Sequence, residues 1–173
     1  MINIEKAVTN KFPGFANKPS VIRKPTLSLL RKLIYEEKIN AFLRDNSDAW
    51  GFEFIDRIFD YFNFTYNVSA RDRANIPASG RVVIFANHPI GSLDGLAILK
   101  LVSEVRSDVR IVANDMLSSF NALENLIVPV DNMTGGSARR SYRRVVESLE
   151  KEQAIVVFPA GEVSRAHPMG IRD

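Results

Sequence analysis

Two hydrophobic periodicities follow one another along this chain, and the change falls near residue 70. Before it, apolar side chains recur at helical spacing in residues 27–45 and 49–64, which predicts two amphipathic helices. Residues 1–25 contain three prolines and little periodicity, so we expect an irregular arm there. The pattern predicts two parts: an arm with two helices at 1–69, and a second domain at 70–173.

The apolar stripe of the second helix has two interpretations. An amphipathic helix usually turns its apolar face toward the core of its own domain, and this interpretation is favoured. An aromatic face of this kind also suits a helix that lies in a membrane surface, and this alternative stays open. The stripe consists of Phe54, Ile55, Ile58, Phe59 and Phe62.

Beyond residue 70, short apolar runs of strand length alternate with helical patterns. Strands are predicted at 81–86, 110–114, 126–130 and 154–159, and helices at 92–105, 116–126 and 137–152. Continuous β-branched runs are typical of strands buried on both faces, and strand–helix alternation favours parallel pairing. We therefore predict an α/β fold: a mostly parallel, mixed sheet flanked by helices, preceded by the N-terminal helical segment.

The end of the chain raises a further expectation. The sequence stops fourteen residues after the fourth predicted strand, with no helix to close that edge of the sheet. We expect a sheet truncated at its C-terminal side, in a fragment of a longer protein.

Composition limits the chemistry. The 173 residues include no cysteine, which excludes disulfides, thiolate nucleophiles and iron–sulfur clusters, and only two histidines, His88 and His167. A net charge of +3 is too small to indicate nucleic acid binding. No apolar stretch reaches the roughly 18 residues of a membrane span. No bound cofactor and no metal site are expected.

The loop after the first predicted strand carries the strongest candidate chemistry. His88 lies where that strand enters a turn containing proline and glycine, and Asp94 follows near a helix start. A carboxylate on one ring nitrogen fixes the histidine tautomer and leaves the other nitrogen to take a proton from a hydroxyl. The alternative is that Asp94 serves only to cap the helix. No G-x-S-x-G motif is present to supply an activated serine.

A second polar loop follows the last predicted strand. Gly161 permits close approach of an anion, and Arg165 is able to bind phosphate or carboxylate with both arms of its guanidinium. Glu162 is placed to orient that arginine or to bind an acceptor. A solvated surface turn with an ion pair is the alternative.

The helix predicted at 137–152 begins with a basic cluster. Its arginines are Arg139, Arg140, Arg143 and Arg144. They follow two glycines at the helix start, an arrangement that favours anions, although a solvated basic face is the alternative. Neither a Walker lysine pattern nor G-x-G-x-x-G is present, so nucleotide binding is poorly supported.

Taken together, the motifs NHPIGSLDG, LIVPVDN and AIVVFPAGEVSR resemble those of the lysophospholipid (glycerolipid) acyltransferase superfamily. The resemblance covers residues 70–173 and points to the bacterial branch of lyso-ornithine-lipid O-acyltransferases and hemolysin-like proteins. It implies that His88 is the catalytic general base and that Asp94 orients it. The spacing here is H-x5-D instead of the superfamily's H-x4-D, which looks typical of the ornithine-lipid branch.

The resemblance also implies substrate-binding positions beside these motifs. Ala160 stands where the superfamily has a glutamate, and Asn132 where it has an arginine, so a glycerol-phosphate acceptor is not specifically indicated. The residues assigned to substrate binding are Asn87, Gly91, Asp131, Gly161, Glu162, Ser164 and Arg165.

The implied reaction moves a fatty acyl group from an acyl carrier protein or coenzyme A thioester to the hydroxyl of a lysolipid, without an acyl-enzyme. The acceptor would be a lysophospholipid or a lyso-aminolipid such as lyso-ornithine lipid, and the arginine-rich helix would contact an acidic carrier. The implied location is cytoplasmic, peripheral on the inner face of the membrane. Two alternatives remain open: a hydrolase using the same His–Asp pair, and a non-catalytic module that binds lipid or carrier.

Overall fold

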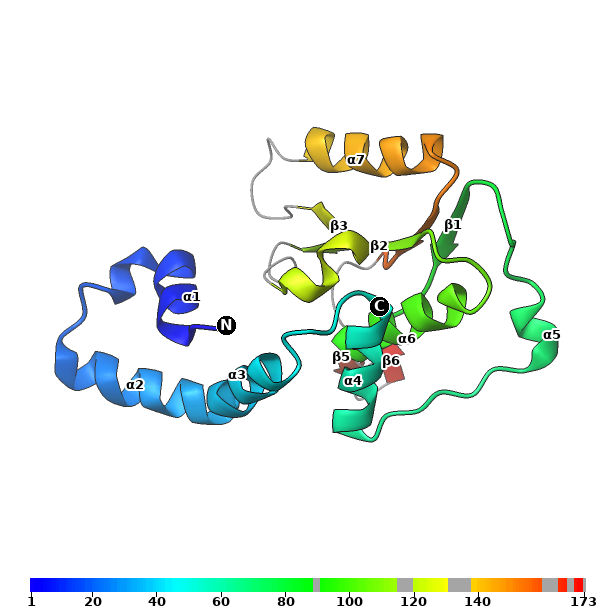
Figure 1. Cartoon of the computed structure of the whole chain (residues 1–173). Helices are drawn as coiled ribbons and strands as arrows, with labels where there is room; N and C mark the ends of the chain where they lie inside the picture. Colours follow the sequence, from blue (N-terminus) through cyan, green and yellow to red (C-terminus); the bar gives the residue numbers. More distant parts are fainter. Residues whose placement is uncertain (89–90, 115–119, 131–137, 160–164, 168–169, 173) are drawn as a thin grey trace. The chain divides into compact units, whose positions relative to one another are not determined.

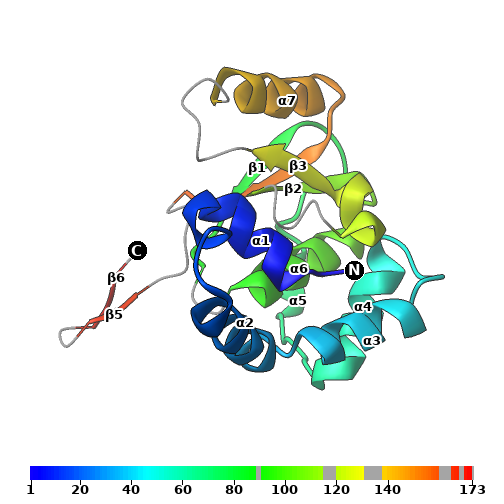
Figure 2. The same ribbon diagram turned by 90° about the vertical axis from the view of Figure 1, so that its left-hand side faces the viewer.

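The chain folds into two compact units, residues 1–48 and 49–173. The computed structural model describes residues 1–172 except 89–90, 115–119, 131–137, 160–164 and 168–169 (Figures 1 and 2). Each unit has its own set of helices, and the predicted sheet lies entirely in the second.

The centre of the second unit is a four-stranded sheet in which every pairing is parallel. Its strands are β1 (Val82–Phe85), β2 (Val109–Asn114), β3 (Ile127–Val130) and β4 (Ala154–Val157), in the spatial order β1-β4-β2-β3. The inner strand β4 buries Ala154, Ile155 and Val156 completely, as its continuous apolar run predicts. The predicted α/β fold is confirmed. Antiparallel pairing occurs in a separate two-stranded sheet of β5 (Arg165–His167) and β6 (Gly170–Arg172).

Helices cover both faces of the parallel sheet. α6 (Ser92–Ser103) connects β1 to β2, and α7 (Ala138–Glu150) connects β3 to β4. These two crossovers run in opposite directions across the sheet, and crossovers between parallel strands are right-handed, so the two helices must lie on opposite faces. Figures 1 and 2 show this arrangement, with α7 above the sheet and α6 below it.

A third helix, α4 (Phe52–Phe62), packs with this unit and contacts α6. It buries Phe54, Ile55 and Phe59, whereas Phe62 at its end is exposed. The inward interpretation of the aromatic stripe is therefore confirmed for its central residues. The boundary between the two compact units falls between residues 48 and 49, before α4. This helix therefore belongs to the unit that contains the sheet and not to the one formed by the helices that precede it in sequence.

The amino ends of the strands are joined by one buried arginine, Arg106. Its guanidinium makes a bidentate ion pair with Asp108, at 2.7 and 2.8 Å, and donates to the carbonyls of Pro77, Gly80 and Glu152. Asp108, Gly80 and Glu152 lie just before β2, β1 and β4, so a single side chain links the starts of three strands. The described residues of this unit also include the short helix α5 (Ala70–Arg73) and the 3-10 helix η3 (Asn121–Leu126), which is the described part of the helix predicted at 116–126.

The N-terminal unit differs most from expectation. The segment predicted to be irregular forms α1 (Ile4–Lys11), the short 3-10 helix η1 (Pro13–Phe15) and the start of α2 (Ser20–Leu33). Pro13 and Pro19 are compatible with this because they lie at helix starts, whereas Pro25 lies inside α2. The residues before α1 are held by a side chain that is distant in sequence: Asn40 accepts a hydrogen bond from the Ile2 N–H at 2.7 Å and donates one to the Ile2 carbonyl at 2.8 Å.

The single helix predicted at 27–45 is instead two helices, α2 and α3 (Glu36–Asp45). The break falls at Tyr35, whose φ of 55° is left-handed. Beyond the break, Glu36 accepts from the Ile4 N–H and pairs with Arg31. Much of the stripe assigned to this helix is not packed, since Leu29 and Leu33 are 59% and 64% exposed. Within the part of the chain that the structure describes, no helix is long and apolar enough to cross a membrane.

Candidate active site

His88 lies just beyond the carboxyl end of β1. The β1–β4 ladder continues past the strand with a hydrogen bond from the Ala86 N–H to the Val157 carbonyl at 3.2 Å, which fixes the backbone two residues before the histidine. The His88 side chain is 19% exposed, so it is largely enclosed but still open to a ligand. Ligands of open α/β sheets gather at this edge, where strands end and loops begin.

Asp94 lies in the first turn of α6 and faces the histidine. The Nδ1 atom of His88 is 3.2 Å from the Asp94 Oδ2 atom. The ring nitrogen is buried but does not point straight at the oxygen, and among the described residues it makes no hydrogen bond of good geometry. Hydrogen bonds between catalytic groups are often loosely aligned until substrate binds, so the separation is compatible with an acid–base pair.

The same carboxylate also caps the helix. Asp94 Oδ2 accepts from the Gly91 N–H at 3.0 Å, while the Asp94 N–H donates to the Gly91 carbonyl at 2.9 Å. Gly91 has a φ of 110°, a conformation that glycine adopts without strain. The capping role of Asp94 is therefore present, and the helix start holds the same oxygen 3.2 Å from the imidazole.

The ring of Phe158 lies against the ring of His88. Phe158 follows β4, and its ring stacks on the His88 ring with centroids 4.2 Å apart and planes 24° apart. Gly95 of α6 lies directly against this ring: a Cβ atom there would come 3.5 Å from Phe158 Cε2 and 2.8 Å from Ile111 Cδ1. A side chain at Gly95 would therefore press on the end of the Ile111 side chain, whereas its contact with the Phe158 ring would be an ordinary van der Waals contact.

Sequence reasoning gave no role to Gly95 and no stacking role to Phe158. The available signal was a glycine inside an otherwise leucine-rich helical pattern, which often marks a close contact. The stacking was not visible, because Phe158 and His88 are 70 positions apart and meet only through the pairing of β1 with β4.

The remaining predicted substrate residues are distributed differently. Asn87 is exposed and precedes the histidine, and Gly91 is buried at the start of α6. Arg165 begins β5, but its side chain is not among those described. Asp131, Gly161, Glu162 and Ser164 lie outside the described residues. Their roles stay predictions. Within the described residues, no group of three metal-ligating side chains is present.

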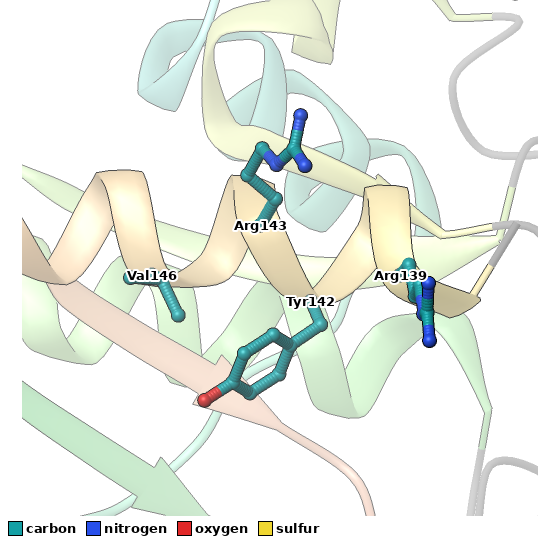
Figure 3. A pocket seen from close by; sticks show the side chains of 4 residues that line it. All are labelled: Arg139, Tyr142, Arg143 and Val146. Carbon is teal, nitrogen blue, oxygen red and sulfur yellow. The ribbon is translucent and has the colours of Figure 1, made fainter.

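The predicted basic helix is α7, and its arginines lie at its surface. Arg139 and Arg143 line a hollow of about 470 Å³ together with Tyr142 and Val146 (Figure 3). Arg144 is used differently, since its Nη1 atom donates to the Pro129 carbonyl at 3.3 Å.

A histidine that lies beside a carboxylate and is open to a ligand has the arrangement of a general base. The ring nitrogen away from the carboxylate would accept the proton, and the carboxylate would stabilise the resulting imidazolium.

Comparison with known proteins gives one family match and two similar curated proteins. A family model described as "Acyltransferase" matches residues 6–172. Two curated proteins, each named lyso-glycine lipid O-acyltransferase, are similar to the whole chain: that of Phocaeicola vulgatus at 27% identity and that of Bacteroides thetaiotaomicron at 29%. The chain spans 60% and 62% of their lengths. No solved structure matches it.

Proposed function

The chain belongs to the acyltransferase family, and from this premise we propose that it carries the catalytic part of an enzyme that transfers a fatty acyl group to the hydroxyl of a lysolipid. The observation that carries the proposal is the 3.2 Å separation between His88 Nδ1 and Asp94 Oδ2 at the carboxyl edge of the sheet. The names of the two relatives support a lysolipid as acceptor.

The proposed mechanism needs no covalent intermediate. His88 takes the proton of the acceptor hydroxyl while the oxygen attacks the carbonyl carbon of an acyl thioester. The tetrahedral intermediate collapses, the carbon–sulfur bond breaks, and the imidazolium returns its proton to the leaving thiolate. Asp94 stabilises the imidazolium between these steps, and backbone N–H groups of the loop are proposed to bind the oxyanion.

The acceptor is proposed to be a lyso-aminolipid. Asn132 stands where the superfamily has an arginine, which argues against a glycerol-phosphate head group. A glycine head group, as in the names of the relatives, carries a carboxylate, and arginine binds carboxylates with two parallel hydrogen bonds. Arg165 is the residue proposed for this contact. A lysophospholipid is the second acceptor to test.

Contact with a membrane surface is proposed for the N-terminal unit. Ile22, Leu29 and Leu33 share one face of α2 and are each more than half exposed. The helix also carries four basic residues and no acidic one, a composition that suits an anionic lipid surface. This supports peripheral attachment, proposed on the inner face of the cytoplasmic membrane. The acyl donor, an acyl carrier protein or coenzyme A thioester, is proposed as a co-substrate and not as a resident cofactor.

Product analysis tests this function against its alternatives. The protein is incubated with radiolabelled acyl thioester, with and without lyso-glycine lipid, lyso-ornithine lipid and lysophospholipid, beside the His88→Ala variant. We expect a diacylated product that requires an acceptor and is missing from the variant. Release of free fatty acid without acceptor would identify a hydrolase, and retention of labelled donor without turnover would identify a binding module; either result contradicts the proposal.

A further inference from the structure

The charged side chains of α7 are arranged in the opposite order to the one that the helix dipole favours. All four arginines lie in its first seven residues, with no acidic side chain in the first turn, whereas Glu147 and Glu150 lie near its end. The helix dipole favours the reverse order. Arg139 and Arg143 are also spaced i, i+4, a separation at which like charges repel. The pattern therefore does not serve the stability of the helix.

The arginines are available to a partner. Arg139, Arg140, Arg143 and Tyr142 are exposed, with Tyr142 at 72%. Within the described part of the chain, none of these arginines is within ion-pair distance of a carboxylate. Figure 3 shows the lining residues along one flank of the helix, with the Tyr142 ring and the Arg143 guanidinium extending from it in opposite directions.

The basic half of α7 lies at the same edge of the sheet as His88. A helix that joins two parallel strands runs antiparallel to them, so its first turns lie at the carboxyl ends of the strands. The α7 helix follows β3 in this way, and His88 follows β1 at that edge. A partner held by the arginines would be bound at the edge where the proposed chemistry takes place.

From these observations we propose that the flank of α7 formed by Arg139, Tyr142, Arg143 and Val146 docks an acidic acyl carrier protein that delivers the thioester. The inference rests on the proposed function, because it names the donor of the same site. Charge complementarity carries it: exposed arginines that pair with no carboxylate of the described residues, around an exposed tyrosine, are typical of a surface that steers and anchors an anionic protein.

The shape and composition of this flank favour a protein over other anions. Small ligands are usually enclosed over most of their surface, and side chains as exposed as Tyr142 do not enclose one. A membrane-binding helix would present a broad apolar face, whereas this flank offers one tyrosine and one valine beside its arginines.

Direct binding tests the proposal independently of catalysis. Fluorescence anisotropy with labelled acyl carrier protein is compared for the wild type, Arg139→Gln/Arg143→Gln, and the control Lys6→Gln/Lys18→Gln. The control removes the same charge from exposed lysines of the N-terminal unit. We expect about tenfold weaker binding for the α7 variant and a weaker dependence of its affinity on salt, with the control unchanged. Glutamine keeps the helix propensity, so circular dichroism and thermal unfolding should match the wild type.

Two results would overturn it. One is equal carrier binding by the α7 variant and the wild type. The other is a wild type that binds coenzyme A or phosphatidylglycerol vesicles through these arginines and does not bind the carrier. Failure of the proposed function gives a different pattern: binding falls in the α7 variant as expected, but no acceptor is acylated by the wild type. With a short pantetheine thioester as donor, the α7 variant should keep the wild-type rate.

Discussion

The two edges of the parallel sheet use their polar side chains in opposite ways. At the amino edge, Arg106 is buried and donates to Asp108 and to three carbonyls, so its hydrogen-bonding capacity is consumed within the fold. At the carboxyl edge, the His88 side chain is 19% exposed, and its buried Nδ1 lies 3.2 Å from Asp94 Oδ2 without a well-aligned hydrogen bond. Saturated hydrogen bonding stabilises the fold, whereas a partly open imidazole ring is accessible to a ligand. The amino edge therefore stabilises the fold, and the carboxyl edge carries the proposed chemistry.

The largest effect on folding is expected at the amino edge. Arg106→Met keeps much of the side-chain volume but leaves the carbonyls of Pro77, Gly80 and Glu152 without their donor. We expect the free energy of unfolding to fall by about 3 kcal/mol, measured by urea denaturation, because buried polar groups lose their partner. Acyl transfer per folded molecule should stay at the wild-type value.

Arg81→Met is the matched control at the same edge. Arg81 pairs with Glu152, but both side chains are more than half exposed. Exposed ion pairs contribute little, so a loss below about 1 kcal/mol is expected. An equal loss in the two variants would show that burial does not distinguish them.

At the carboxyl edge, Asp94→Asn separates the two roles of the carboxylate. The amide oxygen is still able to accept from the Gly91 N–H, so unfolding should change by less than about 1 kcal/mol. The negative charge beside His88 is lost, and we expect the rate of acyl transfer to fall about 100-fold. Asp94→Ala removes the cap as well. If Asp94→Asn turned over as fast as the wild type, helix capping would be the only role left for Asp94.

A smaller effect is expected from Phe158→Leu, which removes the ring under His88. Aromatic stacking contributes about 0.5–1.5 kcal/mol, so turnover should fall about fivefold. NMR gives a second readout, since the protein contains only two histidines. The ring-current shift of the His88 protons should disappear in the variant, while the signals of His167 stay in place. Unmoved His88 signals would contradict the stacked geometry.

The smallest effect concerns pH at the amino edge. The hydrogen bond from Arg106 is the main cause that lowers the pKa of Asp108 below its ordinary 3.8. A lowered folded pKa contributes stability that is present above pH 3.8 and is lost as the pH falls through the folded value. Because the carboxylate is 41% exposed, we expect this contribution to be under about 1 kcal/mol. The stability difference between wild type and Asp108→Asn should shrink on acidification, as measured by urea denaturation from pH 6 to pH 3.

What the sequence predicts well is local. Continuous apolar runs located all four parallel strands to within about two residues of their ends, and the short loop between β1 and α6 was enough to bring His88 to Asp94. Features held by distant residues were missed. The first helices depend on Asn40 and Glu36, and Arg106 resembles an ordinary surface arginine until its partners assemble around it.

Gly95 shows the same limit at the site. A glycine in a helix favours replacement by alanine on propensity alone, by about 1 kcal/mol. Only the packed structure shows that a methyl group there would come 2.8 Å from Ile111 Cδ1, so that the Ile111 side chain would have to shift. This constraint comes from the distance between helix and sheet, which no local pattern encodes.

The role of His88 is tested by the rate of acyl transfer to a lysolipid in the His88→Ala variant, normalised to folded protein. We expect this rate to fall about 1,000-fold, since the general base is removed, with an unfolding free energy within about 1 kcal/mol of the wild type. A folded His88→Ala protein that acylates the same acceptor within threefold of the wild-type rate would show that His88 is not the general base.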